Sequence, residues 1–229
     1  MEKSHQIIWH EDAVPPATLK ALRFCAKQDW LHQSAWYLAG GTALALYVGH
    51  RQSQDLDFFI ADSTFDTAVL LRHFEGTPWK TDILREATVY GSMFGAKVSF
   101  IAYPFFVPKE TPNWFGAIRV LAPRDIAVMK MTAISQRGKK RDFIDLYWYT
   151  KNREPLIDIL LRLPAQYPTV THDYHHILKS ITYFKDADED VMPQLNFKVT
   201  WKEVKRYFER EAPLVSKKLM ELSNLRPAF

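Results

Sequence analysis

The chain has 229 residues, of which 47% are hydrophobic and 24% are charged, proportions that are typical of a folded globular protein and exclude a disordered chain. Its formal net charge of +4 is compatible with an anionic partner such as an NTP or RNA but does not by itself indicate one. A single cysteine, Cys25, excludes an intramolecular disulfide, and the absence of a signal peptide or a long apolar run leads us to expect a cytoplasmic protein with no membrane partner.

The first half of the chain alternates short apolar runs with helical segments. Hydrophobic spacing and chain breakers predict helices over residues 16–28, 42–48 and 65–74, and strands over 35–39, 56–60 and 97–103. Residues 83–94 are predicted to form a hairpin with Gly91 near its turn. The stretch from 104 to 121 has no clear pattern.

The second half of the chain is predicted to be almost entirely helical. We expect helices over 125–137, 141–150, 155–163, 174–184 and 201–222, the first with Asp125 in its opening turn. The predicted fold class is therefore α+β. A mixed sheet flanked by helices would occupy residues 1–122, and a helical lobe would occupy residues 123–229.

A predicted strand runs directly into Gly40 and Gly41, and a helix starts at Thr42. Glycines at such a junction allow a tight turn and a close approach of the backbone to a ligand. The start of a helix offers unpaired N–H groups and a positive dipole end, which suit a phosphate.

Two aspartates, Asp55 and Asp57, stand at the head of the next predicted strand. Because side chains alternate along a strand, both carboxylates are predicted to point to the same face. Paired carboxylates that also leave room for water and phosphate oxygens are typical ligands of Mg²⁺. A solvated strand end is the alternative for the acids alone, and their combination with the glycine turn favours a nucleotide site.

Two stretches of this sequence resemble a known family. They are GGTALALYVGHRQSQDLDFF at residues 40–59 and DIAVMKMTAISQRGKKRDFIDLYW at residues 125–148. Both are similar to motifs of the AbiEii/AbiGii toxin-like branch of the DNA polymerase β-like nucleotidyltransferase superfamily, and the resemblance covers residues 36–150. It implies a minimal nucleotidyltransferase fold followed by a helical lobe, a cognate antitoxin as partner and, as in some members, the 3′ end of tRNA as acceptor.

The resemblance also implies roles for individual residues of the first motif. Asp55 and Asp57 would ligate Mg²⁺ and act in catalysis. Arg51, in the loop before them, would contact a phosphate or pair with an acid. The residues expected to contact phosphate directly are Gly40, Gly41 and Thr42.

In the second motif, Lys130 would meet the triphosphate and act in catalysis. Lys130 and Arg137 share a helical face with apolar residues, and a cation placed so either has an anionic partner or extends to water. Asp142 and Asp145 are predicted to orient these two cations, with a surface ion pair to Arg141 as the alternative for Asp145. The basic run 137–141 would grip an RNA backbone or form a solvated connection between helices.

One residue departs from the superfamily pattern. Many members carry a third carboxylate on a later strand, and Ser99 stands where this chain would place it. A serine is neither a base at neutral pH nor a good ligand for a second metal ion. Glu86, on the predicted hairpin, is the alternative source of a third acid.

We therefore predict a Mg²⁺-dependent nucleotidyltransferase that moves an NMP from an NTP to an acceptor hydroxyl. RNA or tRNA is the favoured acceptor, in a toxin of an abortive-infection or toxin–antitoxin system. The alternatives are a non-catalytic nucleotide-binding module, which Ser99 keeps open, and a transferase acting on a protein or small-molecule hydroxyl.

Overall fold

The computed structural model describes residues 7–224. The chain divides into two compact units. The first comprises Met1–Ile126 with Gln194–Asn196, and the second comprises Ala127–Pro193 with Phe197–Phe229. The division falls four residues after the boundary expected at residues 122 and 123.

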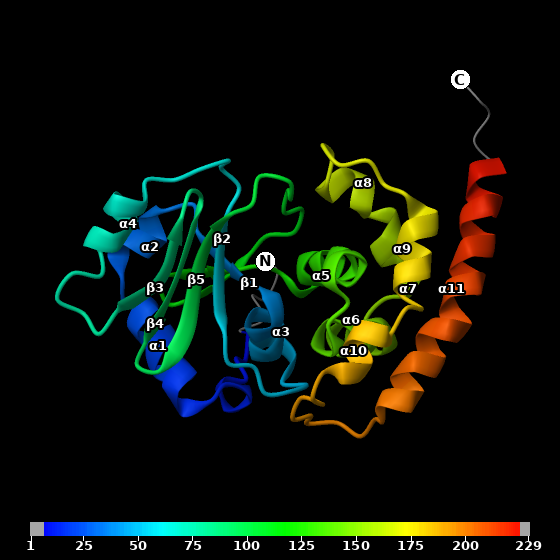
Figure 1. The fold of residues 1–229 in the computed structure, drawn as a ribbon, viewed down its shortest axis with the longest axis horizontal. Coiled ribbons are helices and arrows are strands. Elements are labelled where there is room, and N and C mark those ends of the chain that lie inside the picture. The colour runs from blue at the N-terminus through cyan, green and yellow to red at the C-terminus, as the bar shows by residue number, and fades with distance from the viewer. Residues whose placement is uncertain (1–6, 225–229) are drawn as a thin grey trace, which may run out of the picture. The chain divides into compact units, whose positions relative to one another are not determined.

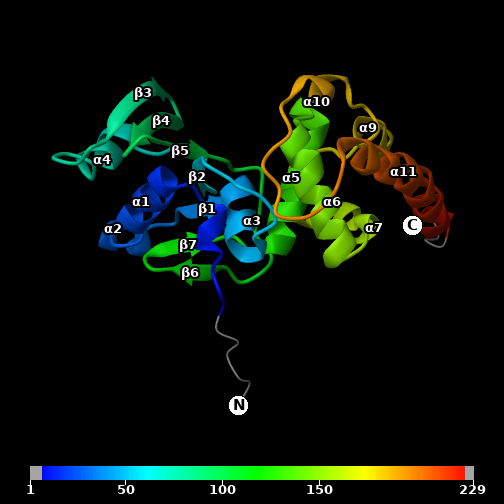
Figure 2. The same ribbon diagram turned by 90° about the horizontal axis from the view of Figure 1, so that it is seen from below.

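The first unit is built on one mixed sheet of seven strands in the order β3-β4-β5-β2-β1-β7-β6 (Figures 1 and 2). β2 pairs antiparallel with β1 and parallel with β5, and β1 pairs parallel with β7. The strands are β1 (Tyr37–Ala39), β2 (Leu56–Ile60), β3 (Lys80–Arg85), β4 (Thr88–Met93), β5 (Ala96–Ala102), β6 (Asn113–Phe115) and β7 (Ile118–Val120). The helices of this unit are η1 (Glu11–Ala13), α1 (Pro16–Cys25), α2 (Asp29–Gln33), α3 (Gly40–Val48) and α4 (Thr67–Arg72).

The two faces of this sheet differ in burial. Leu38, Phe58 and Phe100 are register partners on one face, and each is fully buried. The rings of Phe58 and Phe100 stack 4.9 Å apart, and Trp30 packs near Phe100 from α2. The alternate residues of β2, which point to the other face, are only half-buried. The apolar face is therefore the core of the unit, and the acids predicted for the site lie on the more open face.

The second unit is helical. α5 (Pro123–Arg137) begins at the end of the first unit and continues into the second. Phe143 packs with the rings of Phe184, Trp201 and Phe208 and forms the centre of the aromatic core of this unit. The remaining helices are α6 (Lys140–Asn152), α7 (Leu156–Leu161), α8 (Leu163–Gln166), α9 (Tyr174–Ser180), α10 (Lys185–Glu189) and α11 (Trp201–Asn224).

The predicted fold class is confirmed: a mixed sheet with flanking helices is followed by a helical region. The hairpin turn, however, was placed wrongly. The turn lies between β3 and β4, where Ala87 adopts a φ of 59°, whereas Gly91 lies inside β4. A Cβ at residue 91 would lie 2.3 Å from the ring of Trp79, so the glycine is needed for packing and not for a turn.

Two short strands, β6 and β7, occupy the stretch that had no clear sequence pattern. Each has three residues, too few for an alternation to be recognised. Among the helices of residues 7–224, none is long and apolar enough to pass through a bilayer.

Candidate functional site

The two glycines at the start of α3 are required for different reasons. Gly40 has a φ of +75°, a left-handed conformation that favours glycine, and a Cβ there would lie 3.2 Å from Oδ2 of Asp57. Gly41 has ordinary backbone angles, but a Cβ there would lie 2.2 Å from a terminal guanidinium nitrogen of Arg51. The glycine pair therefore lets an aspartate and an arginine approach the first turn of a helix.

Asp55 and Asp57 lie at the head of β2, as predicted, and both side chains are half-exposed. Asp57 is the register partner of Ala39, the residue that precedes Gly40. The hydroxyl of Thr42 bonds to the backbone carbonyl oxygen of Asp55 and lies 3.0 Å from the hydroxyl of Ser53. The structure thus brings both acids next to the first turn of α3.

Ser99 occupies the position beside Asp57 where a third carboxylate was expected. The two residues are partners in the parallel pairing of β2 and β5, and the Ser99 hydroxyl donates to Oδ1 of Asp57 over 2.7 Å. Glu86 does not take this position. It follows β3 at the hairpin tip, four residues before Tyr90, which pairs with Ser99, and four residues of strand span roughly 13 Å.

Arg51 lies close to this corner and is 3% exposed. Its Nη1 donates to the carbonyl oxygen of Gln52 over 2.9 Å, and its guanidinium contacts Gly41 as described above. The sequence predicted that Arg51 contacts either a phosphate or an acid. Its burial beside a helix N-terminus puts its positive charge where an anion would bind.

A short segment from far along the chain holds the Arg51 loop. The backbone N–H of Asn196 donates to the carbonyl oxygen of His50, and the N–H of Gln52 donates to the carbonyl oxygen of Gln194, both over 2.9 Å. The side-chain amide of Asn196 donates to the carbonyl oxygen of Gly49 over 2.7 Å. No sequence signal marks this segment, because Gln-Leu-Asn in a loop carries no motif.

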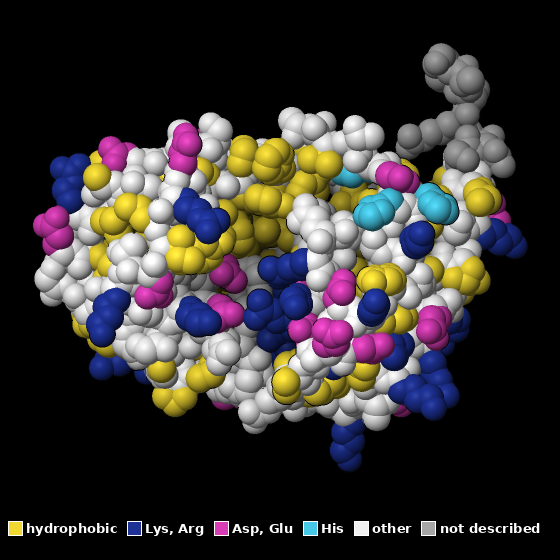
Figure 3. Space-filling model, in the orientation of Figure 1, with side chains coloured by type: hydrophobic (Ala, Val, Ile, Leu, Met, Phe, Trp, Pro, Cys, Tyr) yellow, Lys and Arg dark blue, Asp and Glu magenta, His cyan; other side chains and the backbone are white. Residues whose placement is uncertain are grey.

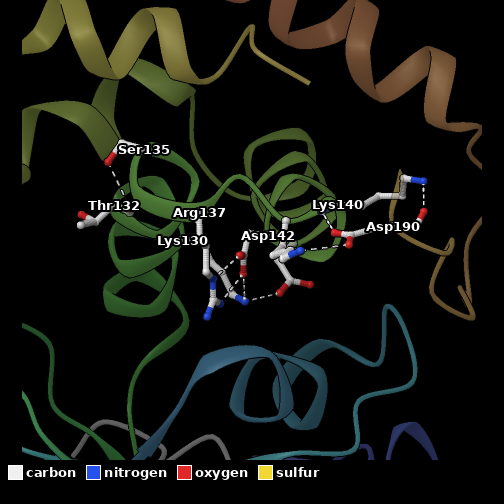
Figure 4. Close-up of polar contacts among 9 residues, drawn as sticks. Lys130, Thr132, Ser135, Arg137, Lys140, Asp142 and Asp190 are labelled. Carbon is white, nitrogen blue, oxygen red and sulfur yellow. Dashed lines mark hydrogen bonds and ion pairs between the residues drawn. The ribbon is translucent and has the colours of Figure 1, made fainter. Parts of the chain in front are cut away.

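In the second unit, Lys130 is bound by two carboxylates. Its ammonium lies 2.7 Å from Oδ1 of Asp142 and 2.7 Å from Oδ2 of Asp145 (Figure 4). The Lys130 side chain is 5% exposed, and both carboxylates are fully buried. Asp145 is therefore a buried partner of Lys130, as predicted. An ammonium has three N–H donors, so one remains beyond the two that these carboxylates engage.

Arg137 also binds Asp142 but remains half-exposed. Its Nε donates to Oδ2 over 3.0 Å and its Nη2 donates to Oδ1 over 3.2 Å. Burial alone would raise the pKa of Asp142, but Lys130 and Arg137 outweigh it and lower the pKa below its ordinary value. The predicted contacts of Asp142 and Asp145 with the cations are present, and the effect of these contacts on a nucleotide stays a prediction.

The basic run at residues 137–141 is partly buried in local contacts. Lys140 is 6% exposed; its backbone N–H donates to Oδ2 of Asp190 over 2.9 Å, and its ammonium binds the carbonyl oxygen of Asp190 (Figure 4). Lys139 lies 3.3 Å from Oδ1 of the same aspartate. For these two lysines the contacts favour a connection between helices over a grip on RNA.

The residues at the head of β2 suit a magnesium ion. Two half-exposed carboxylates lie next to a helix N-terminus, and Mg²⁺ in nucleotide enzymes is commonly held by one or two carboxylates together with substrate phosphates. Within residues 7–224, no group of three or more His, Cys, Asp or Glu side chains is arranged to hold a metal ion. Any metal at this corner would therefore depend on Asp55, Asp57 and oxygens from the substrate.

Comparisons with known proteins identify a matching family and a relative. The family model described as "Nucleotidyl transferase AbiEii toxin, Type IV TA system" matches residues 29–92 and 89–224. An uncharacterised protein of Aquifex aeolicus (strain VF5) is 35% identical over 187 residues, which are 77% of this chain and 85% of that protein.

A solved structure of TM-score above 0.5 has the same fold. The crystal structure of JHP933 from Helicobacter pylori matches 92% of this chain and 97% of its own chain with a TM-score of 0.55 and 21% identity. The nucleotidyltransferase toxin MenT4 from Mycobacterium tuberculosis matches 85% and 84% of the two chains, with a TM-score of 0.47 and 18% identity. The first likeness, at this low identity, supports the fold alone.

Proposed function

Because this chain belongs to the AbiEii nucleotidyltransferase toxin family of type IV toxin–antitoxin systems, we propose that it transfers an NMP from an NTP to a hydroxyl of an RNA acceptor, in the cytoplasm. The chain is a nucleotidyltransferase, and its family implies a nucleotide substrate and an antitoxin partner. The observation that carries the proposal is the placement of Asp57 against the first turn of α3, where Gly40 allows the approach.

The triphosphate is proposed to bind at the N-terminus of α3. This helix has nine residues, and its first N–H groups and dipole favour an anion. Arg51 adds a full positive charge beside Gly41. The Thr42 hydroxyl is engaged with Asp55, so Thr42 would contact phosphate through its backbone N–H.

Asp55 and Asp57 are proposed to hold Mg²⁺. When bound, the ion would neutralise charge on the phosphates and polarise the attacking hydroxyl. The Ser99 hydroxyl donates to Oδ1 of Asp57 and orients that carboxylate, and Oδ2 lies on the side of Gly40. Attack at the α-phosphorus would proceed in line, with pyrophosphate leaving toward α3.

Lys130 and Arg137 are proposed to bind triphosphate oxygens, a role that rests on the family resemblance. The third N–H of Lys130 and the exposed half of Arg137 are the groups that could do so. Asp142 and Asp145 would hold the two cations in place.

Ser99 favours a second candidate function, a nucleotide-binding module without transfer. With serine in place of a third carboxylate, no acid lies beside Asp57 on β5 to accept the proton of the attacking hydroxyl. Such a module would bind NTP at the same corner and leave it unchanged.

The test is incubation of the protein with labelled NTPs, Mg²⁺ and total RNA, compared with Asp57→Asn. Label should enter RNA with the wild-type protein, and the variant should lose at least 1,000-fold in rate because charge stabilisation at the phosphorus is lost, an effect on the order of 4 kcal/mol. The matched control is Asp66→Asn, since Asp66 is an aspartate that only caps α4, and it should transfer at the wild-type rate.

Two results would count against transfer to RNA. Saturable NTP binding with no labelled product would establish the binding module. Label in protein but not in RNA would identify a protein hydroxyl as the acceptor.

A further inference from the structure

The open face of the sheet continues beyond the acids as an apolar surface. Asp57 and Ser99 share a row of the register with Tyr90 of β4 and Ile83 of β3. Tyr90 is 40% exposed and Ile83 is 44% exposed. Register partners point to the same face of a sheet, so this row extends from a half-exposed acid to two exposed apolar side chains.

Aromatic rings form the next row of the same face. Phe59 lies two residues after Asp57, which is roughly 7 Å along the strand. Its ring lies 5.8 Å from that of Tyr103, which in turn lies 5.9 Å from the ring of Phe105. Phe105 is 51% exposed. Figure 3 shows hydrophobic side chains gathered over β2 and the loop that follows β5.

Tyr37 lies at the end of this aromatic row. It is the register partner of Phe59, and the two rings stack 6.1 Å apart. The residue is 4% exposed, yet its hydroxyl makes no hydrogen bond to any described residue. A buried hydroxyl without a partner costs free energy, which a ligand that reaches it would offset.

Three cations flank these rows, and two acids, Asp82 and Glu86, lie on the same hairpin. Lys97, on β5, is exposed and pairs with Ser92 in the row that precedes Ser99. Lys80 pairs with the same serine from β3, and Arg85 pairs with Thr88 beside the aromatic row. Aromatic rings flanked by cations are typical of surfaces that bind single-stranded nucleic acid.

The triphosphate is proposed to bind at the N-terminus of α3, and the position of this aromatic surface relative to that helix end decides which substrate the surface binds. Asp57 lies between Ala39 on one side and Ser99 on the other. The triphosphate is proposed to lie on the Ala39 side, at α3. In-line displacement places the attacking group opposite the leaving pyrophosphate, so the acceptor approaches from the side of Ser99 and Tyr90.

We propose that this surface, formed by Tyr90, Phe59, Tyr103 and Phe105, binds the unpaired 3′-terminal bases of the acceptor RNA by stacking. The inference rests on the proposed function, because it takes the nucleotide site as given and identifies the acceptor side. Bases held in a duplex cannot present their faces to these rings, so the surface selects acceptors with a single-stranded end.

The test measures RNA binding without turnover, so that it does not depend on transfer. Fluorescence anisotropy would compare a stem with four unpaired 3′ nucleotides and the same stem with a blunt end. We expect the wild-type protein to bind the overhang RNA at least 10-fold more tightly. The double variant Tyr90→Ala/Phe105→Ala should lose most of that preference, since each stacked base contributes a fold-change of this order.

Matched controls keep the outcome specific. Tyr183, in the helical unit, is 50% exposed, and Tyr183→Ala should bind both RNAs like the wild type. NTP binding by the double variant should be unchanged. Equal affinity of the wild-type protein for both RNAs, or an unchanged preference in the double variant, would overturn the inference.

The two proposals fail separately. If the wild-type protein transfers label but binds the overhang RNA and the blunt RNA equally, only the stacking surface is contradicted. Preferential binding of the overhang RNA by a protein that transfers no label would contradict only the proposed reaction.

Discussion

Two pairs of aspartates in this molecule have opposite environments. Asp55 and Asp57 are half-exposed at the head of a strand, and a serine hydroxyl donates to Asp57. Asp142 and Asp145 are fully buried on a helix and both bind the ammonium of Lys130. The buried pair is neutralised by protein cations, whereas the strand pair is in part exposed to solvent. The same side chain is therefore expected to serve stability in one unit, and it is proposed to serve chemistry in the other.

The largest expected difference between the two pairs is in the free energy of unfolding, and it is tested at Asp142. Asp142→Asn should lower the free energy of unfolding by roughly 3–5 kcal/mol, because it leaves Lys130 and Arg137 with an incomplete set of buried charges. Asp57→Asn should change the free energy of unfolding by less than about 1 kcal/mol, since a half-exposed carboxylate is exchanged for a side chain of the same shape. Urea denaturation of both variants measures the difference. Equal losses would show that the two pairs are not distinct.

The dependence of stability on pH sharpens the same contrast. The pKa of Asp142 is lowered in the folded protein, so its contribution is complete above the unfolded pKa of about 4 and is lost as the pH falls from there through the folded pKa. When the pH is lowered below about 4, the urea concentration at the unfolding midpoint of the wild-type protein should therefore decrease. This decrease should be smaller in Asp142→Asn. A parallel pH profile for the variant would assign the acid sensitivity to other carboxylates.

The strand pair was predictable because its signals are local. Gly40-Gly41 and the Asp-x-Asp spacing lie within one stretch of sequence, and period-2 alternation places both acids on one face. The contacts of Lys130 with Asp142 and Asp145 followed from helical spacing and the family resemblance. Their depth of burial did not, because it depends on how the helices of the second unit pack.

Other features were beyond a sequence pattern. The three residues from Gln194 to Asn196 contact the Arg51 loop across more than 140 positions of chain. Gly91 was taken for a turn residue because glycine is common in turns, whereas packing against Trp79 is the actual constraint. Both depend on contacts between residues distant in sequence or on opposite strands, which periodicity does not encode.

A smaller effect is expected at Ser99, whose hydroxyl donates a hydrogen bond to Asp57. Ser99→Ala removes the hydrogen bond to Asp57, and we expect the transfer rate to fall roughly 5- to 10-fold, equivalent to about 1 kcal/mol. Ser99→Asp puts a second carboxylate directly beside Asp57, where like charges repel. The melting temperature of Ser99→Asp should therefore be lower than that of the wild type without Mg²⁺ and should rise more steeply as Mg²⁺ is added.

Thermal denaturation across a Mg²⁺ titration distinguishes these outcomes. Arg85→Ala, at the far end of the hairpin, serves as a control that also changes charge on the sheet. If Mg²⁺ stabilises Ser99→Asp no more than the wild type, the head of β2 does not bind the ion.

The smallest expected effect concerns the contacts that hold Arg137 in the helical unit and Arg51 near the strand pair. Arg137 is oriented by a buried carboxylate, whereas main-chain hydrogen bonds to Gln194 and Asn196 help to hold the Arg51 loop. Asn196→Ala removes one hydrogen bond, from its side-chain amide to the Gly49 carbonyl, and should raise the KM for NTP by about 2- to 5-fold with kcat nearly unchanged, because a net hydrogen bond contributes about 1 kcal/mol. Asn152→Ala removes an equivalent amide-to-carbonyl bond of 2.7 Å in the helical unit and should leave the KM unchanged. If both variants behave alike, residues 194–196 stabilise the fold without positioning Arg51 for the nucleotide.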